Sequence, residues 1–319
     1  MAREMSTTAA AEGRAADTPA QMPARGWRQI LKRTWDESRR DNLGLVAAGV
    51  AFYGFLAMAP LLASMVLIYG LVVDPADVIA HVRTLTALVP ADAAGIIEEQ
   101  LRNAVAAAAG KSGPGLLLAL GLALFGAMKG AGAIITALNV VYEEEESRKL
   151  IRLTLVKAAV TLGALLLALC GLAATSVTAY LQQVVGATGG LSIIVQTASW
   201  IVTGLLASAF VAALYRHGPD REEARWSWLA PGSLIATLGI VLTTAGFGVY
   251  AANVGKFNAT YGSLGAIVAL LTWFYFSAHI LLLGAELNAE LEHQTARDTT
   301  TGPDKPLGRR EAVMADTVA

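Results

Sequence analysis

The chain has 319 residues, of which 55% are hydrophobic and only 15% are charged, and its mean hydropathy is positive. A soluble domain carries roughly 25% charged residues, so this composition predicts a membrane protein. The net charge of −1 does not suggest a nucleic-acid partner, for which a strongly basic face is expected. The single cysteine, Cys170, excludes an intrachain disulfide framework or thiolate metal cluster.

The two ends of the chain differ in composition from its middle. The first 40 residues are rich in Ala, Thr and Arg and lack the apolar core that a secretory signal peptide requires, so we expect the N-terminus not to be cleaved. Residues 1–25 and 293–319 are poor in large apolar side chains, and we expect both to be disordered and cytoplasmic. Residues 26–292 are predicted to form the membrane domain.

Six apolar runs are long enough to cross a bilayer core of about 30 Å. They lie at about 43–73, 114–138, 154–182, 191–215, 228–252 and 261–287. The sequence therefore predicts an all-α polytopic membrane protein with six transmembrane helices. Pro60 lies near the middle of the first run, where its missing N–H and its ring favour a kink or break, so we expect a bent first span with a hinge at this residue.

The connection at 74–113 is long, and its apolar residues recur at helical spacing. Such a pattern predicts two external amphipathic helices between the first and second spans, lying over the bundle or in the interface plane. A static packing cap and a mobile lid both fit this pattern.

The distribution of Lys and Arg predicts the topology. Nineteen lie on the side of the two termini, and four lie on the other side: Arg83, Arg102, Lys111 and Lys256. Because positive charge accumulates in cytoplasmic loops, both termini are predicted to be cytoplasmic.

Lys129 is a charged residue near the centre of the second apolar run. A charge at this depth costs about 2.5–3.5 kcal/mol, and intramembrane charges are candidates for function. Gly126 and Gly130 would let a neighbouring helix approach, so we expect Lys129 to face the bundle interior. Its expected partners are His279 and Glu286 of the sixth run. A structural ion pair or a snorkelling side chain is the alternative to a polar pathway.

Other polar motifs indicate no catalytic chemistry. The acidic run 143–146 reads as a solvated loop, and Asn139 and Tyr142 before it suit a membrane interface. The hydrolase, zinc-protease and phosphate-binding motifs GxSxG, HExxH and GxxxxGK[ST] do not occur, and the four histidines fall in four different segments. Neither a metal nor a cofactor is predicted, and we expect the protein not to be an enzyme.

Three stretches resemble the YihY/BrkB family of bacterial inner-membrane proteins, historically also labelled ribonuclease BN. They are "DNLGLVAAGVAFYGFLAMAPLL" (41–62), "GAMKGAGAIITALNVVYEEEESR" (126–148) and "FNATYGSLGAIVALLTWFYFSAHILLLGAELNAELE" (257–292). The resemblance covers about 40–292 and implies six helices, cytoplasmic termini and work on the cell envelope. Carried over by motif position, the residues of interest are Pro60, Lys129, Asn139, Tyr142, Asn258, Tyr261, Gly262, Trp273, Glu286 and Asn288.

Together, the resemblance and the intramembrane charge favour a transporter or flippase-like carrier of an amphipathic envelope molecule. The predicted polar pathway comprises Lys129, Asn139, Tyr142, Asn258, Tyr261, His279 and Glu286. Membrane lipids are the expected partners, and nucleic acid is not. The alternative is a non-transporting scaffold for envelope machinery, with ribonuclease activity third. A polar cavity that reaches mid-membrane would favour the transporter.

Overall fold

The computed structural model describes residues 12–69, 114–185, 190–254 and 263–319, together with a few residues between 95 and 106. Within these ranges the elements are η1 (Pro19–Gln21), α2 (Ala24–Arg40), α3 (Leu43–Tyr69), α6 (Pro114–Val141), α7 (Leu150–Val185), α8 (Gly190–His217), α9 (Trp226–Val254), α11 (Ser263–Gln294) and α12 (Val313–Asp316). The only β-pairing in these ranges is an isolated bridge between Ala224 and Thr300. The all-α prediction is confirmed.

Six of these helices are long and apolar enough to cross a membrane: α3, α6, α7, α8, α9 and α11. They correspond one for one to the predicted apolar runs. A helix satisfies all of its backbone hydrogen bonds internally, which a segment in hydrocarbon must do. The expected external helices at 74–113, together with Asn258, Tyr261 and Gly262, lie outside the described residues apart from isolated positions at 95–106.

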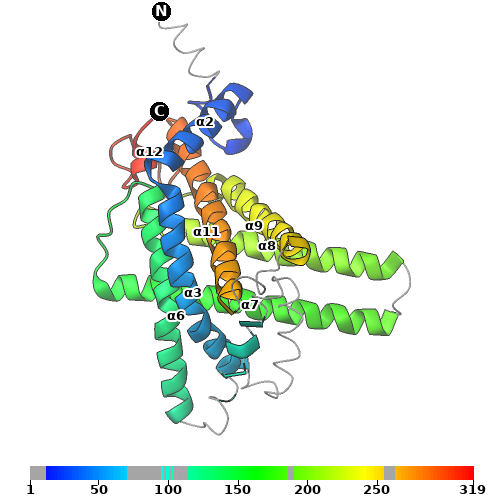
Figure 1. Cartoon of the computed structure of the whole chain (residues 1–319). Helices are drawn as coiled ribbons and strands as arrows, with labels where there is room; N and C mark the ends of the chain where they lie inside the picture. Colours follow the sequence, from blue (N-terminus) through cyan, green and yellow to red (C-terminus); the bar gives the residue numbers. More distant parts are fainter. Residues whose placement is uncertain are drawn as a thin grey trace, which may run out of the picture.

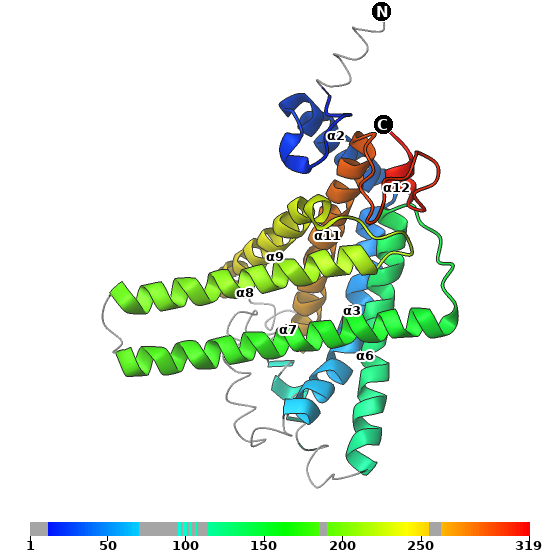
Figure 2. The ribbon, with the colours of Figure 1, turned by 180° about the vertical axis from the view of Figure 1, so that it is seen from behind.

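The spanning helices form a bundle crossed by a helix pair. Figure 1 shows α3, α6 and α11 running together, and Figure 2 shows α7 and α8 lying side by side across them. The most extensive contacts are those of α3 with α6 and of α9 with α11. In the second pairing, a Cβ at Gly232 would lie 2.0 Å from the carbonyl oxygen of Gly284, so only glycine allows this backbone approach.

Pro60 lies inside α3, and the helix continues through it without the break that a proline favours. Its ring fills the space beside Gly126 of α6, where a Cβ would lie 2.9 Å from the proline Cγ. Ser64 donates a hydrogen bond of 2.9 Å to the carbonyl oxygen of Pro60. Pro60 thus belongs to the α3–α6 contact, and its role as a hinge stays a prediction.

The C-terminal tail differs from the expectation of disorder. Figure 1 shows it folded back with α12 over the same end of the bundle as α2. The guanidinium of Arg310 is buried and donates hydrogen bonds of 2.6–3.1 Å to the carbonyl oxygens of four residues: Ala296, Arg297, Lys305 and Ala315. Thr295 likewise donates 2.7 Å to Ala16 of the N-terminal segment. The expectation of disorder was based on the shortage of large apolar side chains in this segment. In the structure, polar contacts hold the tail in place instead.

Candidate functional site

A groove of about 710 Å³ lies where α3, α6 and α7 meet. Each helix contributes residues spaced three or four apart, which is one face of a helix. The lining is Val46, Gly49, Val50 and Tyr53 of α3; Phe125, Met128, Lys129, Gly132, Ala133, Thr136, Ala137 and Val140 of α6; and Leu150, Thr154 and Lys157 of α7. At 1.5 Å per residue, the stretch from Phe125 to Val140 extends about 22 Å along α6.

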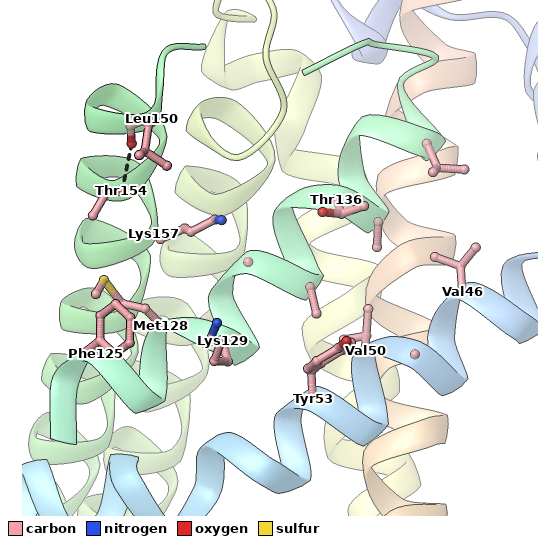
Figure 3. A pocket seen from close by; sticks show the side chains of 15 residues that line it. Val46, Val50, Tyr53, Phe125, Met128, Lys129, Thr136, Leu150, Thr154 and Lys157 are labelled. Atoms are coloured by element: carbon pink, nitrogen blue, oxygen red, sulfur yellow. Dashed lines mark hydrogen bonds between the residues drawn. The ribbon is translucent and has the colours of Figure 1, made fainter. Parts of the chain in front are cut away.

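Lys129 is exposed in this groove rather than buried in the bundle. Figure 3 shows its ammonium group directed into the space between α6 and α7. The Nζ atom lies 5.7 Å from the ring centroid of Phe125, close enough for a cation–π contact. No carboxylate among the described residues forms an ion pair with it. Lys129 is therefore a cation on the flank of the protein, beside the lipid.

Lys157 of α7 is a second cation in the groove. In Figure 3 its ammonium group extends from α7 towards α6, into the same space as that of Lys129. A Cβ at Gly132 would lie 3.1 Å from its Cε and 3.4 Å from its Nζ, so the absent side chain of this glycine makes room for the lysine. Sequence reasoning counted Lys157 with the cations of the preceding loop and missed it as a site residue. Its position inside the third predicted apolar run, 154–182, was the available signal.

The lining combines positive charge with apolar walls. Its titratable cations are the two lysines, and no acidic residue is among the described residues that line it. Tyr53 and Thr136 add hydroxyl groups, whereas the hydroxyl of Thr154 already donates to Leu150 at 2.8 Å. A site of this kind can hold an anionic group together with a hydrocarbon chain.

The structure does not bring Lys129 to its expected partners on α11. The groove contains no residue of that helix, and among the described residues no ion pair or hydrogen bond joins Lys129 to Glu286 or His279. The expectation of a lysine facing the bundle interior is wrong because α3 occupies the glycine face of α6. Gly126 packs on Pro60, and a Cβ at Gly130 would lie 3.0 Å from that of Ala57.

Glu286 and His279 instead have separate surroundings. Glu286 is fully buried, and neither of its carboxylate oxygens has a hydrogen-bond partner among the described residues. His279 stacks on Tyr275, with ring centroids 5.9 Å apart. The indole Nε1 of Trp273, also of α11, donates 3.0 Å to Thr244.

The sequence suggested a membrane-interface position for Asn139 and Tyr142, but both residues lie inside the protein. Asn139 accepts a hydrogen bond of 2.8 Å from the backbone of Asp220 and donates one of 3.1 Å to Glu146. Tyr142 is fully buried beneath the guanidinium of Arg221, 4.7 Å from its ring centroid. Burial raises the pKa of Tyr142, so its hydroxyl stays protonated. Both residues serve the packing of the bundle end.

A buried ion pair beside Tyr142 was not expected from the sequence. Arg221 and Glu292 lie 2.6 Å apart with side chains 1% and 0% exposed, and Thr299 of the tail donates 2.7 Å to the same carboxylate. Burial lowers the pKa of Arg221, but Glu292, Tyr142 and Glu144 together raise it above its usual value, so the guanidinium stays charged. Asn288, which belongs to α11 as Glu292 does, joins this helix to α9. Its side-chain amide donates a hydrogen bond to the carbonyl oxygen of Leu229 and accepts one from the backbone N–H of Gly232.

Among the described residues, no group of three or more His, Cys, Asp or Glu is placed to hold a metal ion.

The acidic run after α6 forms hydrogen bonds and an ion pair with its surroundings rather than being wholly solvated. Glu144 accepts a hydrogen bond of 2.9 Å from the backbone of Val313, and Glu146 forms an ion pair of 2.6 Å with Arg148. Burial raises the pKa of Glu144, whereas the hydrogen bonds from Arg148 lower that of Glu146. This run belongs to the bundle end.

Comparison with known proteins identifies relatives over most of the chain. The family model described as Virulence factor BrkB matches residues 34–308. YfkH of Bacillus subtilis, whose name calls it ribonuclease-like, is 28% identical over 255 residues, which cover 77% of this chain and 88% of YfkH. A UPF0761 membrane protein of Rhodospirillum centenum is 29% identical over 296 residues, and one of Idiomarina loihiensis is 33% identical over 161.

These alignments cover 90% and 50% of this chain, respectively. They cover 62% of the Rhodospirillum protein and 55% of the Idiomarina protein, so the chain spans only part of the length of these UPF0761 relatives. No solved structure matches the chain significantly.

Proposed function

The chain belongs to the virulence factor BrkB family, and we propose that it acts in the bacterial inner membrane as a transporter or flippase-like carrier of an amphipathic envelope molecule. The observation that carries this proposal is the α3/α6/α7 groove, which extends along α6 to Lys129 near the middle of the helix. A carrier of amphiphiles needs a path for a polar group at that depth, whereas a scaffold can be packed solid.

The shape of the groove suits a molecule that keeps its hydrocarbon chain in the bilayer. The groove is formed on the flank of three spanning helices, so its polar groups face the lipid side. A headgroup could move along the two lysines while its chain remained among the acyl chains. A charge in hydrocarbon is costly, and a polar lining lowers that cost.

The expected sidedness gives the groove a direction. It begins beside Val140 and Leu150, which flank the loop with Arg148 and Lys149. The distribution of Lys and Arg predicts that this loop is cytoplasmic. On that basis the groove is open to the cytoplasmic leaflet, and its cargo enters from there.

The scaffold alternative has an observation of its own. The described parts of the two terminal segments form an ordered cap on one end of the bundle, joined by contacts such as Thr295 to Ala16 and Gln294 to the backbone of Glu12. Such a cap offers a fixed surface to cytoplasmic partners. Ribonuclease activity is not part of our proposal, because the groove holds lysines and hydroxyls without a carboxylate or histidine for acid–base chemistry.

Transport can be measured in vesicles that contain the purified full chain. A phospholipid with a fluorescent headgroup label is included, and dithionite bleaches the label in the outer leaflet only. We expect protein-containing vesicles to bleach beyond the outer-leaflet share, at a rate that falls about tenfold or more in Lys129→Met. Lys32→Met, at an exposed lysine of α2 away from the groove, is the matched control and should retain the wild-type rate.

A scaffold would give bleaching equal to that of protein-free vesicles. If bleaching equals that of protein-free vesicles both with the fluorescent phospholipid and with a polyprenyl phosphate probe, the proposal is overturned. Equal incorporation and thermal stability of the variants must accompany the rates, so that a loss of transport is not a loss of folded protein.

A further inference from the structure

We infer that the α3/α6/α7 groove is a binding site for the phosphate group of an anionic amphiphile, held between Lys129 and Lys157 with its hydrocarbon chain along the apolar walls. The inference rests on the proposed function in taking this groove as the cargo site. It adds the chemical class of the cargo and names the residues that select it.

The groove carries positive charge that the protein does not balance. Lys129 and Lys157 have no ion-pair partner among the described residues, although the nearby Arg148 is paired with Glu146 and Asp220. Charged groups in a membrane are almost always paired or in contact with water. Two neighbouring cations without an acid are therefore complementary to an anion that the protein does not supply.

The kind of cation favours phosphate over carboxylate. Lysine binds phosphate as a compact point charge, whereas planar carboxylate recognition favours the fork of an arginine. A phosphate group has several oxygens and can contact ammonium groups from two directions at once. The lysines come from α6 and α7, on opposite sides of the space seen in Figure 3, with the hydroxyl of Thr136 on the same wall as Lys129.

The apolar part of the lining commits the site to an amphiphile rather than to free phosphate. Val46 and Val50 of α3 and Phe125 and Met128 of α6 form walls beside the lysines. The side chain of Phe125 is 61% exposed, as expected of a residue in contact with hydrocarbon. A free anion would leave these walls uncovered, whereas a lipid chain would cover them.

Gly132 provides a way to close the groove without changing its charge. The three atoms nearest to a Cβ added at this residue all belong to Lys157, and Gly132 itself lines the groove, so a larger side chain would extend into it. Leucine is a good helix former, and Gly132→Leu should therefore preserve α6. It would push the Lys157 ammonium aside and fill the space where the phosphate is expected.

Lipid binding to the purified full chain in a neutral detergent can be measured by native mass spectrometry. The probes are phosphatidic acid, phosphatidylglycerol and phosphatidylcholine with identical acyl chains, and inorganic phosphate. We expect both anionic lipids to bind at least tenfold more tightly than phosphatidylcholine. Lys129→Met and Lys157→Met should each reduce that preference about tenfold, and Gly132→Leu should weaken binding of the anionic lipids. Lys32→Met should leave binding unchanged.

Equal binding of phosphatidylcholine, or an anionic preference that survives Lys129→Met/Lys157→Met, would overturn the inference. So would tight binding of inorganic phosphate that competes with phosphatidic acid, because the site would then be one for a free anion. The two proposals fail separately. Lysine-dependent phosphate preference without transport in vesicles refutes only the carrier function, and transport without such a preference refutes only the cargo class.

Discussion

At the scale of single residues, two fully buried glutamates on one helix have opposite surroundings. Glu292 is paired with Arg221 and accepts a hydrogen bond from Thr299. Glu286, six positions earlier, has no hydrogen-bond partner for either oxygen in the described part of the chain. Removing one member of a buried ion pair leaves an uncompensated charge, whereas removing an unpartnered carboxyl removes only its desolvation cost.

We therefore predict that Glu292→Met lowers the stability of the protein by about 3–5 kcal/mol, while Glu286→Met leaves it unchanged or raises it. Thermal unfolding of the two variants in the same detergent measures the contrast. Equal destabilisation would show that Glu286 has a stabilising partner after all. If Glu286→Met is stable but loses transport, Glu286 belongs to the polar pathway predicted from the sequence.

Asp41 provides a pH-dependent prediction outside the spanning segments. Burial, with Glu143 and Glu37 nearby, raises the pKa of Asp41 to about 6. Because the folded-state pKa exceeds the unfolded value, folding takes up a proton between about pH 4 and 6. The contribution of Asp41 to stability is thus present at low pH and lost as pH rises through 6.

Asp41→Asn should accordingly raise the melting temperature at pH 7.5, and this gain should shrink at pH 5, where Asp41 is already protonated. Melting curves of wild type and variant at both pH values check the sign. A gain of the same size at both would mean that the carboxylate charge is not the cause. Because Asp41 is only partly buried, solvent screening keeps the effect small.

At the scale of elements, helix packing depends on where side chains are missing. Gly232 and Gly284 bring α9 and α11 together, and the atom that a Cβ at Gly232 would meet first is a backbone oxygen, which cannot turn aside. At Gly246 on the same helix, no atom of another described residue outside the adjacent helix backbone lies within 4 Å of the Cβ position. Substitutions at the two glycines therefore distinguish the effect of helix packing from the effect of helix propensity.

Gly232→Ala should destabilise the protein by about 1–3 kcal/mol through overpacking. Gly246→Ala should be neutral or stabilise it by up to about 1 kcal/mol, because alanine favours the helix. Unfolding midpoints in detergent compare the two. A tolerated alanine at position 232 would require α9 and α11 to lie farther apart than the structure shows.

At the scale of the whole molecule, an even number of spanning helices places the two described ends together. The η1–α2 segment and the tail that ends beyond α12 lie at the same end of the bundle (Figure 1). The side of the membrane on which this end lies follows only from charge. The groove opens towards the same end, so its direction depends on the topology.

We predict that fusions after Ala319 or before Met1 are active only with a reporter that functions in the cytoplasm. A fusion within 74–113 should be active only with a reporter that functions outside the cytoplasm. Nineteen Lys and Arg against four is the basis. A periplasmic signal from either terminus would reverse the groove, which would then be open to the outer leaflet.

The sequence by itself determined the six spans and the fold class. It also identified Lys129 as a charged candidate residue within a span. Apolar length is set by the thickness of the bilayer, and the cost of a charge in hydrocarbon does not depend on which helix is adjacent. These properties can be read one segment at a time. The family resemblance could be read in the same way, and the match over residues 34–308 confirms it.

Only the tertiary structure decided what surrounds Lys129. The glycine spacing of α6 indicated that a helix would approach, but every spanning segment is apolar and could have supplied it; the steric fit of Pro60 and Ala57 selected α3. That choice left Lys129 on the flank with Lys157, away from Glu286. The tail was ordered for a similar reason, because the buried contacts of Arg310 and Thr295 form between segments that are distant in the sequence.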